Sequence, residues 1–185
     1  MGTRHIVMVV SGGQMKVAQY GQFDGYPSAA GAEILDFIKG ADMAKFRERV
    51  EKLEFYAEEE VDDILSGGEA CLLTHPWLDR ENSRAVLTFV YEGLTDKLYN
   101  HEFFAKDGLF CEWGYLLDLD HNILEVYKGF SKNPVPDNER FAKYNESGMK
   151  YYPIKLIKTY DFENLPSSKT LVLECDGAGP FDEDD

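Results

Sequence analysis

Hydrophobic residues at the amino end are grouped in two short runs separated by a tight turn. Residues 5–10 and 15–20 are mostly apolar or β-branched, and Gly12 and Gly13 lie between them. Apolar runs of this length bounded by glycine are typical of β-strands, and a short glycine turn favours their antiparallel pairing. The pattern therefore predicts a β-hairpin at the start of the chain.

The middle of the chain has apolar residues at helical spacing in three segments. The first predicted helix covers residues 29–39, with Ser28 as its N-cap. The second covers residues 42–66, where apolar residues recur at three- and four-residue steps, and the third follows Asp79 and ends before Gly93. We interpret the apolar stripe of the second helix as packed on the chain's own sheet, with a coiled-coil dimer as the alternative.

Beyond the helices, the apolar period changes from helical to alternating. Residues 110–119 alternate between apolar and polar positions, a turn follows at 120–122, and an apolar run returns over 123–130. Residues 153–160 and 170–175 indicate two more strands. With about six strands and about three helices, and with hairpins at both ends of the helical block, we predict an α+β fold with a mainly antiparallel sheet.

Length and composition favour a single domain. The chain has 185 residues, of which 44% are hydrophobic, which is enough for one packed core. The last ten residues hold five acids and no base, so we predict one domain over residues 1–175 and a disordered acidic tail over 176–185.

The charge balance excludes some partners. The formal net charge is -15, which opposes binding to nucleic acid or to an anionic membrane. The apolar run at 6–10 is too short for a signal peptide or a membrane span, and three widely spaced cysteines do not suggest a disulfide framework. We therefore expect a cytoplasmic protein, and the sequence leaves a homo-oligomer open.

The loop over residues 20–28 contains two glycines and a proline, precedes the first predicted helix and is the best candidate for a binding site. Helix N-termini present free N–H groups, and the loop supplies tyrosine, glutamine and aspartate side chains for hydrogen bonds and stacking. The alternative is a plain turn with inward-packed tyrosines. The candidate ligand-binding residues, with two neighbours on the first strand, are Arg4, His5, Tyr20, Gln22, Asp24, Tyr26 and Ser28.

Motifs for metals, phosphates and common nucleophiles are missing from the sequence. The four histidines have no metal-binding spacing, and neither GxxxxGK[ST], GxGxxG nor GxSxG occurs. The acidic run at 118–122 lacks the glycine and closing glutamate of a calcium loop, so it indicates a hairpin turn. We predict no metal site and no cofactor.

The amino end resembles the opening of N-terminal nucleophile hydrolases of the proteasome β-subunit type. Gly2-Thr3 is followed by an apolar strand, a Ser-Gly-Gly turn and a second strand. The resemblance implies that Thr3, freed by cleavage after Gly2, is the catalytic nucleophile and uses its own α-amine as base. Gln19 stands where that family has an aspartate, and no lysine matches the residue that lowers the nucleophile's pKa.

Most of the chain, from residue 2 to about residue 165, resembles a family of uncharacterised proteins from fungi, bacteria and phages. The resemblance is carried by the opening Gly-Thr-Arg-His, by the segment 17–27 (usually with Trp where Phe23 stands) and by the stretch 110–115. It implies a single domain and no particular activity.

The sequence therefore leaves three functions open. The first is a domain that binds a polar small molecule or a partner through the loop before the first helix. The second is an amidohydrolase that uses Thr3, and the third is an interaction protein that dimerises through the helix at 42–66.

Overall fold

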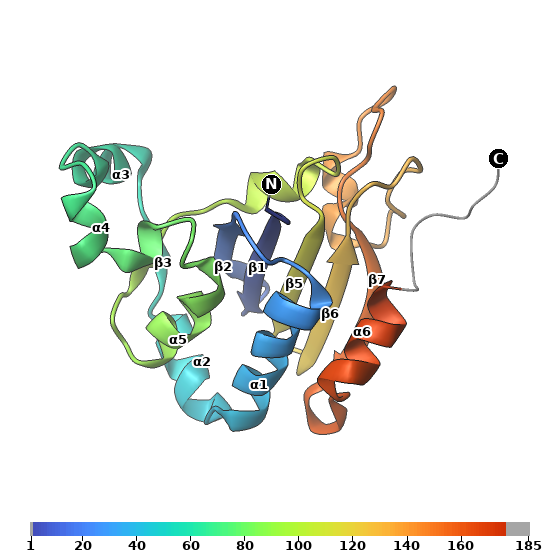
Figure 1. The fold of residues 1–185 in the computed structure, drawn as a ribbon, viewed down its shortest axis with the longest axis horizontal. Helices are drawn as coiled ribbons and strands as arrows, with labels where there is room; N and C mark the ends of the chain where they lie inside the picture. The colour runs from blue at the N-terminus through green and yellow to red at the C-terminus, as the bar shows by residue number, and fades with distance from the viewer. Residues whose placement is uncertain (1, 177–185) are drawn as a thin grey trace.

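The computed structural model describes residues 2–176, which form one mixed sheet with helices on both of its faces (Figure 1). Five strands lie in the order β2-β1-β5-β6-β7. Their bounds are β1 His5–Ser11, β2 Gln14–Gly21, β5 Trp113–Asp118, β6 Ile123–Lys128 and β7 Lys155–Asp161. A separate two-stranded sheet pairs β3 (Glu54–Phe55) with β4 (Lys97–Leu98).

The two predicted hairpins are confirmed, and they meet through the centre of the sheet. β1 pairs with β2 and β5 pairs with β6 in the antiparallel sense, whereas β1 and β5 run parallel. Gly12 and Gly13 both have positive φ angles, of 62° and 70°, which a tight hairpin turn requires. The carboxylate of Asp120, in the turn of the second hairpin, accepts the N–H groups of both glycines at 2.8 Å, so the two turns hold each other.

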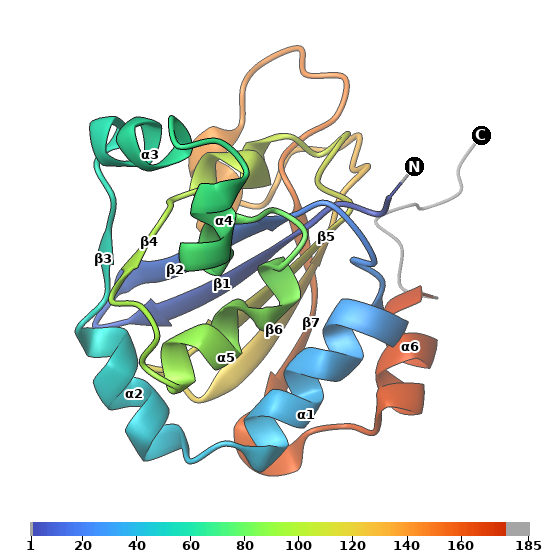
Figure 2. The same ribbon diagram turned by 60° about the vertical axis from the view of Figure 1, so that its left-hand side comes forward.

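Six α-helices are present among the described residues, where about three were predicted (Figure 2). Helices α1, α2, α5 and α6 cover one face of the sheet, whereas α3 and α4 stand off from it. Their bounds are α1 Ala32–Gly40, α2 Met43–Glu51, α3 Glu58–Leu65, α4 Ala70–Thr74, α5 Val86–Tyr91 and α6 Ser168–Asp176.

Strand alternation divides the core into two clusters. Val7 and Val9 of β1 face the α-helices, together with Tyr115 and Leu117 of β5. The alternate residues, Met8 among them, face the 3-10 helices η4 (Glu102–Lys106) and η5 (Arg140–Tyr144) on the other side. Because both faces are covered, the central strands β1 and β5 are almost entirely buried.

The helix predicted over 42–66 is broken in two. α2 ends at Glu51, and the N–H of Glu54 then donates to the carbonyl of Asp96, which draws the chain into the β3–β4 pair. The apolar stripe that suggested a dimer, with Phe46, Val50 and Leu53, is buried in the chain's own core. The continuous helix required for that dimer is therefore not formed, because tertiary strand pairing interrupts it.

The strand predicted over 170–175 is wrong, because these residues belong to α6. Ser167 begins the helix, and its hydroxyl accepts the N–H of Thr170 at 3.1 Å. Leu171 and Cys175, one helical turn apart, are both fully buried against the rest of the core. Of the predicted tail at 176–185, Asp176 is the last residue of this helix and the remainder lies outside the described residues.

The beginnings of the other two helices also differ from the prediction. Ser28 is not an N-cap, because it lies inside a π-helical turn, η1 (Pro27–Gly31), that runs directly into α1. The helix expected after Asp79 starts later, as a 3-10 turn, η3 (Ser83–Ala85), that continues into α5. Gly93 ends α5 with a φ angle of 69°, as its position in the sequence predicted.

A buried ion network closes the second face of the sheet. The guanidinium of Arg140 donates to Glu125 at 2.8 Å and 3.1 Å and also to Asp118. Burial raises the pKa of Asp118, but the hydrogen bonds from His121 and the charge of Arg140 outweigh that effect and leave its pKa below the usual value. Arg140 thus neutralises two carboxylates that the β5–β6 hairpin places inside the fold.

Replacing this arginine should destabilise the protein. In Arg140→Met, the carboxylates of Asp118 and Glu125 lose their cation while their side chains stay 1% and 9% exposed. We expect the free energy of unfolding to fall by about 3 kcal/mol, the low end for a broken buried pair because Arg140 itself is partly exposed. Urea denaturation measures this loss, and Arg80→Met, at an exposed arginine, is the matched control. Equal midpoints for the two variants would contradict the role of Arg140.

Candidate functional site

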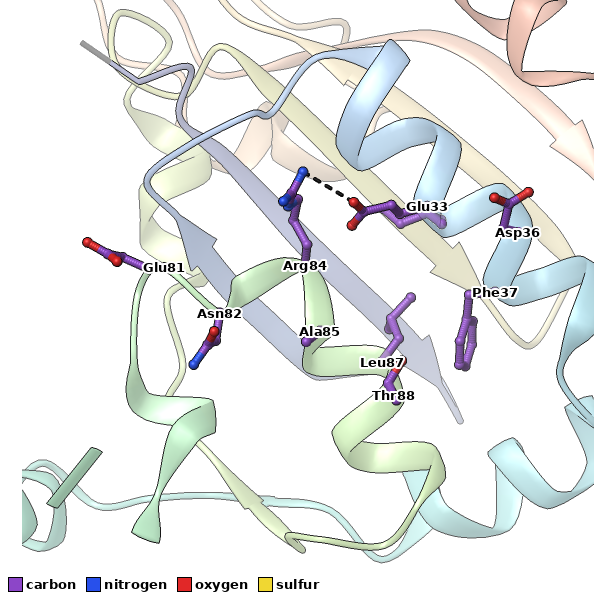
Figure 3. Close-up of a pocket in the computed structure, with 10 residues that line it drawn as sticks. Glu33, Asp36, Phe37, Glu81, Asn82, Arg84, Ala85, Leu87 and Thr88 are labelled. Carbon is purple, nitrogen blue, oxygen red and sulfur yellow. Dashed lines mark ion pairs between the residues drawn. The ribbon is translucent and has the colours of Figure 1, made fainter. Parts of the chain in front are cut away.

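A polar cleft separates α1 from η3 and α5 on the helical face of the sheet (Figure 3). We call it the α1/α5 cleft, and its volume is about 390 Å³. The figure shows the side chains of Glu33 and Arg84 pointing toward each other across it. Its lining is completed by Ile34, Asp36, Phe37, Glu81, Asn82, Ala85, Leu87 and Thr88.

The loop predicted as the binding element, residues 20–28, supplies no residue of this lining, but Asp24 in its 22–28 part contacts Arg84. Its Gly25 is fixed to the sheet twice: its N–H donates to the carbonyl of Thr3 at 2.9 Å, and its carbonyl accepts the hydroxyl of Tyr115 at 2.8 Å. Asp24 adopts a left-handed conformation with φ 54°, which turns the chain toward η1. The loop therefore enters α1 at a defined position beside η3.

Arg84 connects the loop to the wall of the cleft. Its Nη1 atom lies 3.7 Å from Oδ2 of Asp24 and 3.2 Å from Oε1 of Glu33. Because both carboxylates are more than half exposed, each ion pair adds only about 0 to 1 kcal/mol to stability. The guanidinium is therefore held in place by weak interactions that a ligand is able to replace.

A buried histidine lies beneath the loop. His5 is fully buried, and its Nε2 atom is 3.4 Å from the hydroxyl oxygen of Ser83. Two glycines make room for the ring, since a Cβ at Gly21 would lie 2.2 Å from its Cε1 atom and one at Gly25 would lie 2.7 Å from its Cβ. Burial lowers the pKa of His5 to about 4, so the ring is neutral at pH 7.

The structure divides the predicted site residues between the two faces of the sheet. Asp24 and His5 lie on the face of the α1/α5 cleft. Tyr20 lies on the opposite face, where its ring contacts Phe104 edge-on and its hydroxyl donates to Gln22. Arg4 also stands apart from the cleft, with its guanidinium 4.5 Å from the centre of the Phe110 ring. The seven residues therefore do not form one continuous surface.

The remaining predicted residues lie close to the loop. Tyr26 is half exposed and Ser28 is exposed, and both lie at the entry to α1. Thr3, the residue proposed as a nucleophile from the hydrolase resemblance, is 5% exposed. Its catalytic role stays a prediction.

Sequence reasoning missed the charged residues that line the α1/α5 cleft. Glu33 and Asp36 are three residues apart on the exposed face of a predicted helix, a pattern that is equally typical of a solvated surface. Glu81 and Arg84 come from a segment about fifty residues away in the chain. Only the packing of η3 beside α1 brings these charged residues together, so no local sequence pattern predicts the cleft.

Comparisons with known proteins identify no relative. No protein-family model, no curated protein and no solved structure matches the chain. The resemblance to an uncharacterised family therefore remains a prediction.

Residues 2–176 contain neither a metal-binding cluster nor a membrane-spanning helix. Within this range, no group of three or more histidine, cysteine, aspartate or glutamate residues is arranged to hold a metal ion. No helix in the same range is long and apolar enough to cross a membrane.

The buried histidines predict a dependence of stability on pH. Burial lowers the pKa of both His5 and His101 to about 4, whereas an unfolded histidine titrates near 6.5. The unfolded state therefore binds more protons between these values, and stability that is complete above pH 6.5 is lost as the pH falls toward 4. A shift of this size amounts to about 3 kcal/mol per histidine.

Urea denaturation from pH 4.5 to pH 7 tests this dependence. His5→Gln and His101→Gln remove one titrating ring each, so we expect each variant to have a flatter profile than the parent. If the free energy of unfolding of the parent and of both variants changes with pH in the same way, the fold does not lower the pKa of either histidine.

The hydrolase hypothesis has its own test at the amino end. An N-terminal threonine nucleophile needs a free α-amine, so the mature chain would have to begin at Thr3. We expect intact-mass analysis to show that Gly2 is retained, which leaves the nitrogen of Thr3 in a peptide bond. A mature chain that begins at Thr3, with cleavage abolished by Thr3→Ala, would contradict this expectation and favour the hydrolase.

Proposed function

We propose that this protein binds a small polar molecule carrying a cationic group, and that the α1/α5 cleft is its binding site. The observation that supports the proposal is the imbalance of charge in the lining. Three carboxylates, those of Glu33, Asp36 and Glu81, line the cleft, and Arg84 is the one Lys or Arg among its lining residues. A cation is favoured in such a surrounding by direct Coulomb attraction.

Two of these carboxylates are available to a ligand. Glu33 is partly engaged by Arg84, but within the described part of the chain no ion pair involves Asp36 or Glu81. Asp36 projects from α1 and Glu81 from the segment before η3, and Figure 3 shows the two carboxylates at opposite ends of the cleft, with Glu81 turned outward. They therefore attract a cation in the cleft from its two ends by their charge, and a single ammonium group contacts one of them at a time.

The apolar residues of the lining suit the remainder of such a ligand. Phe37 and Leu87 flank the same space, and Asn82 and Thr88 add neutral hydrogen-bonding groups. A volume of about 390 Å³ lies within the usual range for small-molecule sites. The arrangement therefore favours a compact amine with an apolar body over a nucleotide, because the carboxylates would repel the phosphates of a nucleotide.

The loop at 22–28 contributes through Asp24. By pairing with Arg84, Asp24 holds the guanidinium at the end of the cleft nearest the loop. This pairing reduces the repulsion that Arg84 would exert on a bound cation. The proposal thus keeps the loop as part of the site but assigns direct ligand contacts to α1 and to residues 81–88.

Titration with a simple amine tests the proposal. We expect phenethylamine to shift the backbone ¹H–¹⁵N resonances of residues 33–37 and 81–88, and 3-phenylpropanoate, an anion of similar shape, to leave them unchanged. The double variant Asp36→Asn with Glu81→Gln should bind the amine roughly tenfold more weakly, a loss of about 1.4 kcal/mol. Glu48→Gln with Glu51→Gln, on the exposed side of α2, is the control with the same change in net charge.

The variant Arg84→Met shows whether the site prefers a cation or an anion, because the direction of the change in affinity depends on the charge of the ligand. Removing the guanidinium should strengthen binding of the amine several-fold, because its repulsion is lost while three carboxylates remain. If the loss of Arg84 instead weakens binding, or if only the phenylpropanoate produces shifts, the site binds an anion and the proposal is wrong. An amine that binds the control and the double variant equally would also contradict it.

A further inference from the structure

Helices α3 and α4 form a projection at one side of the molecule, away from the α1/α5 cleft (Figures 1 and 2). They contact each other, and α3 is joined to the small sheet by an ion pair of 2.6 Å between Glu60 and Lys97. Val61 is the one residue of α3 that is buried. Most of the surface of this projection is therefore turned toward solvent.

A groove of about 450 Å³ runs along one face of α3. Glu58, Val61, Asp62 and Leu65 line it and follow the spacing i, i+3, i+4, i+7 of a single helix face. Leu78 and the ring of Tyr99 line it from the neighbouring segments. The groove thus combines an apolar surface with two carboxylates one turn apart, which is the complement of a lysine or arginine side chain with its apolar stem and charged end.

The electrostatic surroundings of the groove are strongly acidic. Residues 53–79 contain eight Asp or Glu and no Lys or Arg. Of the bases packed against α3, Lys97 is already paired with Glu60. His101, which also lines the groove, has a pKa lowered by burial to about 4, so it adds no positive charge at pH 7.

The projection also carries two exposed leucines. Leu73 on α4 is 87% exposed and Leu65 at the end of α3 is 45% exposed. Leu65 also lines the groove, so its exposed surface is continuous with the apolar part of the lining. Exposed leucines next to carboxylates match a partner that has both leucine-like and basic side chains on one surface.

We propose that the α3–α4 projection is a docking surface for a basic amphipathic segment of a partner protein. Lysine or arginine side chains of that segment lie in the groove between Glu58 and Asp62, and its apolar side chains cover Leu65 and Leu73. Charge complementarity argues against a second copy of this chain as the occupant, because each copy carries a net charge of -15 and would present the same acidic face. The surface is separate from the α1/α5 cleft, so this proposal does not depend on the proposed function.

A synthetic helix with leucine on one face and lysine on the other is a suitable probe, and its binding can be measured by fluorescence anisotropy at 150 mM salt. Glu58→Lys with Asp62→Lys should weaken binding at least tenfold. Glu48→Lys with Glu51→Lys is the matched control, because it reverses the same two charges on α2 and changes the net charge equally. A peptide that binds the two double variants with equal affinity responds to net charge alone and overturns the proposal.

The apolar part of the surface has a separate pair of variants. Leu65→Ser with Leu73→Ser should weaken binding of the probe several-fold, whereas Leu94→Ser, at a leucine that is 57% exposed elsewhere, should leave it unchanged. Circular dichroism of each variant distinguishes a lost contact from unfolding of the projection. If sedimentation shows that the parent protein self-associates in a Leu73-dependent way, the occupant is a second copy and the proposal is wrong.

Discussion

The parallel pairing of β1 with β5 is the constraint on which the other features of the fold depend. Each strand belongs to its own hairpin, so this single pairing joins the two hairpins into one sheet. Parallel strands need a long connection that leaves one strand and returns to the same end of the next. Here the connection contains α1 through α5, of which α1, α2 and α5 pack on one face of the sheet. The same return brings η3 and α5 beside α1 and so creates the α1/α5 cleft.

Close packing at one end of this sheet explains the glycines of the loop. His5 pairs in register with Gly21 of β2 and with Trp113 of β5, and its ring fills the space beneath Gly21 and Gly25. A larger residue at either glycine would displace the ring or the loop. The buried, neutral histidine is thus a packing element that positions Asp24 and, through it, Arg84. Of the residues that the sequence indicated for ligand contact, Asp24 thus contacts a residue that lines the cleft, and His5 lies beside Ser83.

The excess of negative charge is distributed unevenly between the interior of the protein and its surface. Two carboxylates are buried and neutralised by Arg140, whereas those around the α1/α5 cleft and along α3 remain at the surface. Surface carboxylates beside apolar side chains favour ligands that combine a cation with an apolar part. The cleft and the groove have this chemistry in common, and we propose a small molecule as the ligand of the cleft and a protein segment as the ligand of the groove, which follows one face of α3.

Local patterns in the sequence determined both hairpins, the glycine turns and the α+β class, because strand alternation and turn preferences act between near neighbours. They did not determine the break at 52–57 or the helical state of residues 170–175, since strand pairing with β4 and burial of Leu171 and Cys175 overrode the local preference. The lining of the cleft was also decided by tertiary structure alone. Its acidic and basic residues come from segments about fifty positions apart, and only the crossover between β1 and β5 places them together.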